Sequence, residues 1–512
     1  MDARIPLFVI IPLASAFLIP LLRRIFRPAG QWLASLSLLF LTGLAVKLIF
    51  TGPSSVYKVG GWQPLGGIPV GIYMVLDGLS VYLLVIVNLI GFLSAFYSIS
   101  YMKKFTAEDK YFTLFMLMIA GMNGVVLSGD IFNLFVFMEI AAIASYALVA
   151  FGTEKEELEA SFKYQVLGGL SSLLILLSIG LLYWQSGTLN LADLAVVFRT
   201  NVNTVYSMFV QTLLIVGLGL KTAMFPFHAW LPDAHSSAPS PISSMLSGVL
   251  IKAIGVYVLL RLFFNVFTLS YNIALVIVII GTLSMVMGVL LAIGQWDFKR
   301  LLAYHSISQM GYVVIGVAMG MMILSRNGDP AIASLAIAGG LYHLFNHAVF
   351  KSLLFLNAGA VEYAAGTRNM KELGGLAEKM PVTAATSMSA SMAISGIPPF
   401  NGFFSKLIII IAAVQADYLL LAFLAVLTSI ITLASFLKVQ RYTFFNKPKA
   451  LRQGLEAIQE APFSMAFSMI VLAIVCLVLS LLLLPAVREA VLTPAVNVLM
   501  HGGEYETMIL GK

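Results

Sequence analysis

The chain has 512 residues, of which 60% are hydrophobic and only 10% are charged, and its formal net charge is +7 at pH 7. This composition excludes a soluble globular protein and a disordered chain, and it is typical of an all-α protein that crosses the membrane many times. The single cysteine, Cys476, excludes a disulfide framework and a cysteine-based metal cluster. Basic loops that orient the spans account for the positive charge, so no nucleic-acid partner is expected.

About fourteen hydrophobic segments are long enough to cross a hydrocarbon core of roughly 30 Å as helices. They cover residues 5–22, 31–50, 75–100, 111–128, 131–151, 162–185, 204–234, 242–264, 271–294, 302–324, 331–358, 383–414, 417–437 and 462–486. Prolines break the seventh and the twelfth. The first segment is interpreted as a span and not as a cleaved signal, because its one A-x-A match lies inside the apolar run.

Lysine and arginine are concentrated in the odd-numbered loops between these spans. By the positive-inside rule, those loops are predicted to be cytoplasmic and both termini to lie outside the cell membrane. Five lysines remain inside spans: Lys47, Lys221, Lys252, Lys351 and Lys406. Lys47 is near a span end, where its ammonium can reach the interface. Each of the other four costs roughly 3 kcal/mol or more at mid-membrane, which makes it a candidate functional residue.

The fifth span carries one carboxylate, Glu139, well inside its apolar run. Burial alone would keep this carboxyl group protonated, whereas a lysine nearby would keep it charged. A neutral, hydrogen-bonded residue at a helix interface is the alternative interpretation. The acidic loop that follows, residues 151–163, fits a solvated surface and a docking site for a soluble partner equally well.

The seventh span contains Lys221, a break at Pro226 and then His228 and His235, and the eighth span places Lys252 near its middle. Prolines at bilayer depth leave backbone groups unpaired, which is tolerated only where neighbours or a water-filled cavity satisfy them. This stretch therefore predicts a polar cavity inside the membrane, with the two histidines as auxiliary groups that line the break.

Short sequence matches indicate that the chain repeats itself after the eighth span. The pairs, each five spans apart, are Glu139-x6-Tyr146 with His305-x6-Tyr312, Ala160-x2-Lys163 with Ala348-x2-Lys351, and Phe225–Phe227 with Ile397–Phe400. Because five is odd, the second unit is predicted to be inverted, which is a transporter signature whose breaks mark the ion path. The predicted parts are residues 1–107 (three N-terminal spans), 108–264 and 265–445 (the repeats), and 446–512 (a basic loop, the last span and a tail). Lys163 and His305 become auxiliary candidates by this correspondence.

The eleventh span places His343, His347 and Lys351 at i, i+4 and i+8, which stacks them along one helix face. Two histidines at this spacing could ligate a metal, but no carboxylate or thiol accompanies them and Lys351 would repel a cation, so no metal site is expected. A titratable hydrogen-bonded wire is favoured over plain interhelical hydrogen bonding. The twelfth span then breaks at two prolines and carries Lys406 just after the break.

The chain has no Walker loop, no GxGxxG after a strand, no haem or iron–sulfur ligand set and no Ser/His/Asp arrangement, so no cofactor and no redox chemistry are expected in it. It has instead the titratable groups of a proton relay within the membrane: Glu139, Lys221, Lys252, His343, His347, Lys351 and Lys406. If Lys221 alternates between Glu139 and Lys252, the ion pair is the switch, since charges ~4 Å apart are worth about 4 kcal/mol at an effective dielectric constant near 20.

Five stretches resemble the antiporter-like subunits shared by Mrp-type Na+/H+ antiporters, respiratory complex I and membrane-bound [NiFe] hydrogenases. They are SGDIFNLFVFMEI, KTAMFPFHAWLPDAH, DFKRLLAYHSISQMGY, HLFNHAVFKSLLF and GIPPFNGFFSK, in this order over roughly spans three to thirteen. The resemblance implies fourteen helices, two inverted five-helix repeats and broken helices seven and twelve. Within the family, the chain looks most like the D-type subunit of Mrp antiporters and its archaeal hydrogenase equivalent.

The resemblance also implies roles: Glu139 and Lys221 as the switchable pair, Lys252 as the central relay site, His343, His347 and Lys351 as the connection across the second repeat, and Lys406 as the outlet-side site. The expected function is that of an H+-translocating subunit, coupled to redox chemistry or Na+ exchange in other membrane subunits. These are expected to include a second antiporter-like subunit and a redox module. Na+ is not expected to pass here, because no cage of acidic oxygen ligands is evident. A stand-alone secondary transporter for an organic substrate and a purely structural scaffold are the alternatives.

Overall fold

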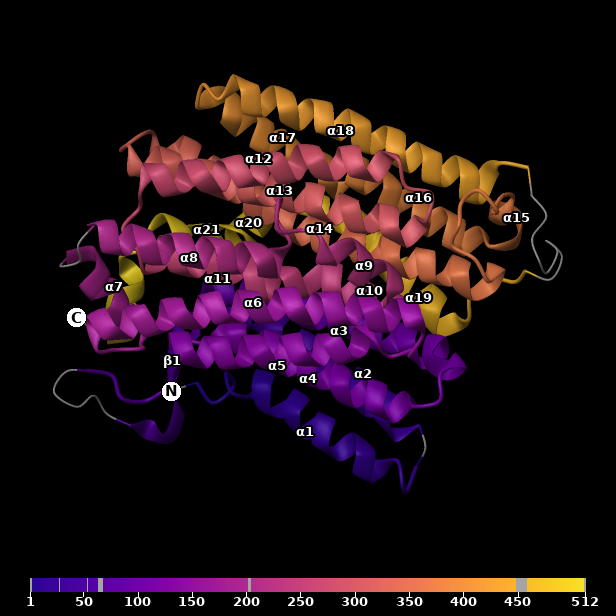
Figure 1. The fold of residues 1–512 in the computed structure, drawn as a ribbon, viewed down its shortest axis with the longest axis horizontal. Coiled ribbons are helices and arrows are strands. Elements are labelled where there is room, and N and C mark those ends of the chain that lie inside the picture. Colours follow the sequence, from indigo (N-terminus) through magenta and orange to yellow (C-terminus); the bar gives the residue numbers. More distant parts are fainter. Residues whose placement is uncertain are drawn as a thin grey trace.

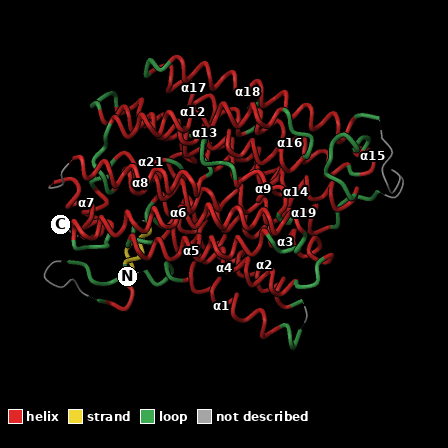
Figure 2. Tube along the Cα trace, viewed as in Figure 1, coloured by secondary structure: helices red, strands yellow, loops and turns green. Residues whose placement is uncertain are grey.

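A computed structural model describes residues 2–26, 28–52, 54–62, 68–200, 204–447 and 458–510. Long helices run side by side along one direction, and both termini lie towards the same end of the bundle (Figure 1). Helix dominates and loops join the helices (Figure 2); the strands within the described residues are one antiparallel pair, β1 (Ser55–Lys58) and β2 (Tyr73–Leu76). Among the described residues, twelve helices are long and apolar enough to cross a membrane. The predicted all-α, multi-span fold class is confirmed.

The first half of the chain forms a helix at each predicted span. These helices are α1 (Leu7–Leu22), α2 (Ala29–Thr51), α3 (Gly78–Tyr101), α4 (Glu108–Leu127), α5 (Ile131–Val149), α6 (Lys155–Ser186), α8 (Thr204–Thr222) with α9 (Trp230–Ser237), and a composite of α10 (Ser240–Met245), η3 (Leu246–Leu250), η4 (Lys252–Val256) and α11 (Tyr257–Asn265). Short elements that were not predicted are η1 (Val59–Gly61), η2 (Met102–Lys104) and α7 (Leu191–Thr200).

The second half of the chain also forms a helix at each predicted span. Its elements are α12 (Tyr271–Ile293), α13 (Phe298–Ser325), α14 (Pro330–Ala365), the short α15 (Leu376–Lys379), α16 (Pro381–Ser395) with α17 (Asn401–Gln415), α18 (Leu419–Val439) with η5 (Gln440–Phe445), α19 (Phe463–Val478) with η7 (Leu479–Leu483), and α20 (Pro485–Val491), α21 (Thr493–Met500) and α22 (Glu504–Leu510). Part of the predicted basic loop, residues 448–457, lies outside the described residues.

Helix α3 lies in the core of the bundle, although the sequence groups it with the peripheral α1 and α2. Most of its residues are buried. The hydroxyls of Tyr82 and Tyr97 donate hydrogen bonds to backbone oxygens of α14, those of Leu341 (2.7 Å) and Leu356 (2.8 Å). These contacts attach the N-terminal part to the helix that carries three of the predicted relay residues.

Both predicted proline breaks exist, between α8 and α9 and between α16 and α17. Side chains from neighbouring segments bind the backbone groups that the breaks release, as burial at bilayer depth demands. Trp230 Nε1 donates to the backbone oxygen of Leu220 at 2.9 Å, and Ser284 Oγ accepts from the backbone N–H of Phe225 at 2.9 Å. Neighbouring side chains thus satisfy part of the irregular backbone at the first break, while Pro226 itself is exposed.

A buried ion pair joins α3 and α11 at the end of the bundle where the termini lie. Arg261 lies within α11, and its side chain is only 1% exposed. Its guanidinium donates to both carboxylate oxygens of Asp77, at 2.6 and 3.0 Å, and also to the hydroxyl of Tyr257 at 3.0 Å. A planar fork on a carboxylate is the arrangement in which a buried arginine is best satisfied.

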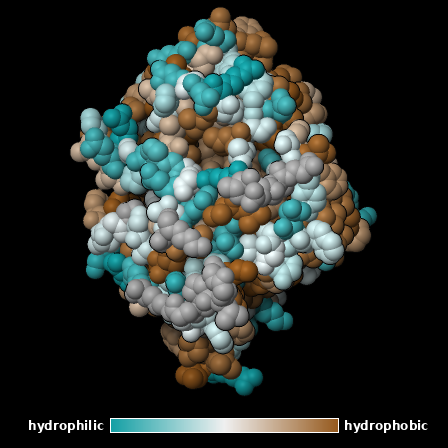
Figure 3. Space-filling view, turned by 90° about the vertical axis from the view of Figure 1, so that its left-hand side faces the viewer, coloured by the Kyte–Doolittle hydropathy of each residue, from teal (hydrophilic) through white to brown (hydrophobic). Residues whose placement is uncertain are grey.

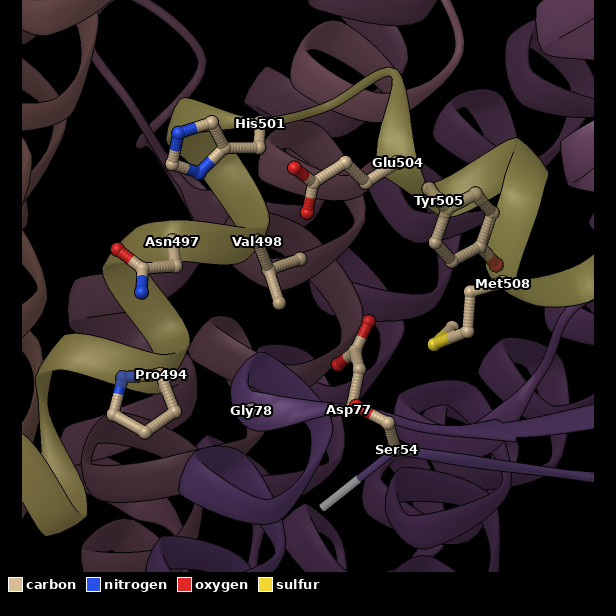
Figure 4. A pocket seen from close by; sticks show the side chains of 10 residues that line it. All are labelled: Ser54, Asp77, Gly78, Pro494, Asn497, Val498, His501, Glu504, Tyr505 and Met508. Carbon is tan, nitrogen blue, oxygen red and sulfur yellow. The ribbon is translucent and has the colours of Figure 1, made fainter. Parts of the chain in front are cut away.

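The C-terminal tail covers this pair. Helices α21 and α22 stand over Asp77, and a pocket of about 310 Å³ between them is lined by Asn497, His501, Glu504 and Tyr505 (Figure 4). The end face there carries many hydrophilic residues, and hydrophobic residues border it (Figure 3). The tail, for which the sequence predicts no structure, thus lies over a buried ion pair.

We expect the Asp77→Asn variant to lower the free energy of unfolding by about 3–5 kcal/mol, because Arg261 would remain buried without an anion. Asparagine can still accept the hydrogen bond from the Ser80 backbone that begins α3. Thermal unfolding in detergent measures the loss. The double variant Asp77→Asn with Arg261→Met is the control, since it removes the unpaired charge and should lose less. A single variant as stable as the native protein would contradict this account.

Candidate ion-translocation site

An ion pair between α5 and α8 lies at the centre of the candidate site. Lys221 Nζ lies 2.9 Å from Glu139 Oε1, and Ser172 Oγ of α6 donates to the same oxygen at 2.6 Å. The lysine also donates to Ser172 Oγ at 3.0 Å. An ammonium at this distance favours the charged carboxylate, so the geometry supports an ion pair over a neutral interface residue.

The two partners differ in exposure. The Lys221 side chain is 2% exposed, whereas that of Glu139 is 23% exposed. Glu139 shares its side of α5 with Phe132, Val136 and Ile143, which are 44%, 39% and 61% exposed. The carboxylate therefore lies at the edge of the chain and the ammonium lies inside it.

Lys252 lies in the eighth span, where the helix widens into two π-type segments, η3 and η4. It is fully buried, and its Nζ donates to the backbone oxygen of Ser247 at 2.7 Å. The hydroxyl of Ser247 lies 2.7 Å from that of Ser306 on α13. Widened turns of this kind are frequent at functional sites. Here the turn brings a carbonyl oxygen onto a buried amine.

The three polar residues of α14 reach different neighbours. His343 Nδ1 lies 2.9 Å from Ser405 Oγ on α17, and Lys351 Nζ donates to the backbone oxygen of Leu302 on α13 at 2.5 Å. His347 lies between them, fully buried, and neither of its ring nitrogens has a hydrogen-bond partner among the described residues. Buried polar atoms are normally hydrogen-bonded. This imidazole is therefore a candidate to form short-lived hydrogen bonds with a group that delivers a proton.

Lys406 follows the second break. Its Nζ donates to the backbone oxygen of Ile394 at 2.8 Å and to Ser429 Oγ at 3.2 Å, and it lies 4.9 Å from the ring centre of Tyr312. Ile394 is at the C-terminal end of α16, where free carbonyls and the helix dipole attract a cation. A pocket of about 240 Å³ beside Lys406 opens between α17 and α18.

The auxiliary candidates fall into two groups. His235 and His305 are fully buried, with ring contacts to Phe355 (5.9 Å) and Phe436 (4.9 Å) respectively, and His228 is half-buried and stacked on a phenylalanine. Lys163 stands apart: its ammonium is exposed and forms ion pairs with Asp233 and Glu159 at 2.9 and 2.8 Å. The histidines are therefore placed within the buried polar region, and Lys163 is placed on its surface.

Two features of the site have no clear signal in the sequence. Ser172 is one of many serines in apolar helices, and its contact with Glu139 depends on how α5 and α6 pack. Lys299 lies just before the predicted tenth span, 302–324, and it is only 1% exposed, because the first turn of α13 directs it inward. Among the described residues, no three His, Cys, Asp or Glu side chains are placed to hold a metal ion together.

Comparisons with known proteins agree with this fold. The family described as "NADH:quinone oxidoreductase/Mrp antiporter, TM" matches residues 128–432, and "NADH-Ubiquinone oxidoreductase (complex I), chain 5 N-terminus" matches residues 62–116. The N subunit of the NADH-quinone oxidoreductase of Desulforudis audaxviator is 34% identical over 449 residues, which are 86% of each chain. The D-type subunit of the Na(+)/H(+) antiporter of Alkalihalophilus pseudofirmus is 33% identical over 403 residues, 78% of each chain.

Similarity in three dimensions extends over the whole chain. A chain in the structure of the Mrp complex from Dietzia sp. DQ12-45-1b superimposes with a TM-score of 0.88 and 27% sequence identity, and the match covers 100% of both chains. The match to the first family spans more than half of the sequence and includes both proline breaks. The chain belongs to the family of antiporter-like membrane subunits found in NADH:quinone oxidoreductases and Mrp antiporters.

Proposed function

We propose that this chain translocates H+ as one subunit of a larger membrane complex, through a relay of glutamate, lysine and histidine side chains at mid-membrane. The ion pair of Glu139 with Lys221 carries the proposal, because it places a fixed anion against a long, mobile cation inside the bundle. Two charges ~4 Å apart interact by about 4 kcal/mol at an effective dielectric constant near 20. Separating this ion pair therefore changes the local electrostatic energy by enough to drive a proton transfer.

The relay works through alternation at Lys221. While Lys221 is paired with Glu139, the positive charge of Lys221 is neutralised. Lys252 can then hold a proton taken up from the cytoplasmic side. When Lys221 leaves Glu139, its positive charge acts on Lys252, which then gives up the proton. We take His347 as the acceptor, because it is fully buried between His343 and Lys351 on α14 and neither of its ring nitrogens has a hydrogen-bond partner among the described residues.

Lys406 is the last site before release. The proton reaches it from His343, which contacts Ser405, the residue immediately before Lys406. The pocket beside Lys406 provides room for water or for a group of a neighbouring subunit. Two inverted repeats, spans four to eight and nine to thirteen, would give the two halves of the path opposite orientations. Na+ exchange or electron transfer, with any electron-carrying cofactor, takes place in other subunits.

The exposure of Glu139 supports a neighbouring subunit. A carboxylate that is 23% exposed on the same face as Phe132, Val136 and Ile143 would meet lipid at mid-membrane if this face stayed open. Charged groups at that depth face protein or water. We therefore assign a second antiporter-like subunit to this face, in a complex of the cell membrane that includes a redox or antiport module. Both termini are assigned to the outer side.

The complex as purified from its membrane and reconstituted into vesicles tests the function, with acidification of the vesicle interior as the measurement. Identification of the co-purified subunits tests the partners in the same preparation. The chain expressed alone should not exchange Na+ for H+ in vesicles. Transport by the isolated chain would support the stand-alone transporter instead.

We expect Lys221→Ala to abolish H+ translocation by the assembled complex, because no mobile cation remains to modulate the next site. The same change in a structural scaffold would leave translocation unchanged. Lys47→Ala is the matched control, since Lys47 is an exposed lysine on α2, also within a span. Native gel electrophoresis shows whether each variant assembles, and the initial rate of vesicle acidification shows whether it pumps.

We expect Lys252→Met to stop translocation without lowering stability. Methionine has a similar length, and its substitution removes an amine that is fully buried and bonded only to a backbone oxygen in the described contacts. Taking a desolvated polar group out of the interior leaves the free energy of unfolding unchanged or raises it by about 1 kcal/mol. Thermal unfolding and vesicle acidification are measured on one preparation. A variant that pumps at the native rate would remove Lys252 from the relay.

A further inference from the structure

A second pocket lies at the end of the bundle that is predicted to be cytoplasmic. It has a volume of about 480 Å³ and lies among the ends of α3, α6 and α14 and the turn before α10. Its lining includes the carboxylates of Glu157 and Glu362 and the cations Lys299 and Arg368. We call this pocket the inner vestibule. None of these residues belongs to the relay described above.

Lys299 is the one basic residue of the vestibule that is almost completely buried, at 1% exposure among the lining residues that the structure describes. Its Nζ donates to the backbone oxygen of Ala238, in the turn between α9 and α10. The next residue, Arg300, turns outward instead and pairs with Asp233 at 2.8 Å with 39% of its side chain exposed. The helix thus directs one of two adjacent cations to the interior.

His235 lies beyond Lys299 towards the relay. It is three residues before Ala238, and Ser243 Oγ donates to the backbone oxygens of both residues, at 2.8 and 3.1 Å. Its ring is fully buried, and neither ring nitrogen has a hydrogen-bond partner among the described residues. Its ring lies 5.9 Å from that of Phe355 on α14, and Lys351 Nζ lies 5.9 Å from the centre of the same Phe355 ring. His235 therefore links the turn that holds Lys299 to the surroundings of Lys351.

We propose that the inner vestibule is the site of proton uptake and that Lys299 passes protons from it to His235 and so to the relay. This proposal rests on the proposed function. The two carboxylates attract protons to the vestibule, and the neutral amine of Lys299 takes one from vestibule water. The ammonium then releases it to a free ring nitrogen of His235, which in turn gives its proton to Lys252 or Lys351. Each transfer moves one H+ and restores the neutral donor.

The backbone acceptor of Lys299 suits this role. A carbonyl oxygen accepts a hydrogen bond from an ammonium and from a neutral amine, so the contact with Ala238 survives the loss of the proton. A lysine that only held the turn in place would serve equally well as a permanently charged residue. Arginine separates these two possibilities, because it keeps the charge and the donors but does not release a proton in proteins.

The first test is Lys299→Arg in the complete complex, with Lys103→Arg as the matched control. Lys103 is exposed, directly precedes the vestibule residue Lys104 and does not itself line the vestibule. We expect Lys299→Arg to assemble and melt like the control but to translocate H+ at least about tenfold more slowly, as expected when a proton-transfer group is lost. Translocation at the native rate would overturn the proposal, and if Lys252→Met is inactive in the same assay, the proposed function stands without it.

A second test does not depend on whether Lys299 tolerates replacement. Cys476, the only cysteine, is buried, so the chain is suited to labelling at an introduced thiol. We expect a charged, membrane-impermeant thiol reagent to modify Glu362→Cys from the cytoplasmic side of vesicles and to slow translocation by at least about tenfold. Labelling of Lys103→Cys should leave the rate unchanged. Complete labelling of Glu362→Cys without a change in rate, or labelling only from the outer side, would overturn the proposal.

Discussion

The structure depends on one constraint: an ionic group inside the bilayer must have a partner, because its hydration is lost. The chain meets this constraint in two ways. Asp77 and Arg261 form a fully buried pair with two parallel hydrogen bonds, covered by the C-terminal helices, and this arrangement joins α3 to α11. Glu139 and Lys221 form a pair with one contact and an exposed edge. The first pair is fully enclosed, whereas the second has the less enclosed geometry that the proposed switch requires.

Backbone carbonyl oxygens are the partners of the other buried lysines. Lys252, Lys351 and Lys406 each donate to a carbonyl oxygen, which carries no net charge. A carboxylate partner would hold each lysine in its ammonium form and would be left as a buried anion when the proton departs. A carbonyl accepts from both forms of the amine, so each lysine can lose a proton without stranding a charge. A widened helix supplies the oxygen for Lys252 and a broken helix the one for Lys406, which connects the irregular backbone to the proposed chemistry, whereas Leu302 lies in the regular helix α13.

Local chemistry explains what the sequence predicts correctly. Apolar length predicts the spans, prolines predict the two breaks, and the penalty for burying charge marks Glu139 and Lys221. These signals fail where the direction or the partner of a side chain depends on helix rotation or on contacts distant in the sequence. Arg261 and Lys299 stand near span ends like many loop residues, and only packing shows that each points inward. Ser172 acquires its partner because α5 and α6 are neighbours, which no spacing within either helix expresses.

The two halves of the candidate path are chemically unequal. Where the first half has Glu139, the sequence match places His305, which is packed on Phe436 and cannot become an anion. Lys406 accordingly has neutral neighbours in its described contacts, two oxygen atoms and the face of Tyr312. An ion pair that closes and opens requires both signs of charge, and among the proposed relay residues only those of the first half offer both. In the proposed relay the electrostatic switch therefore belongs to the first half, and the second half conducts the displaced proton.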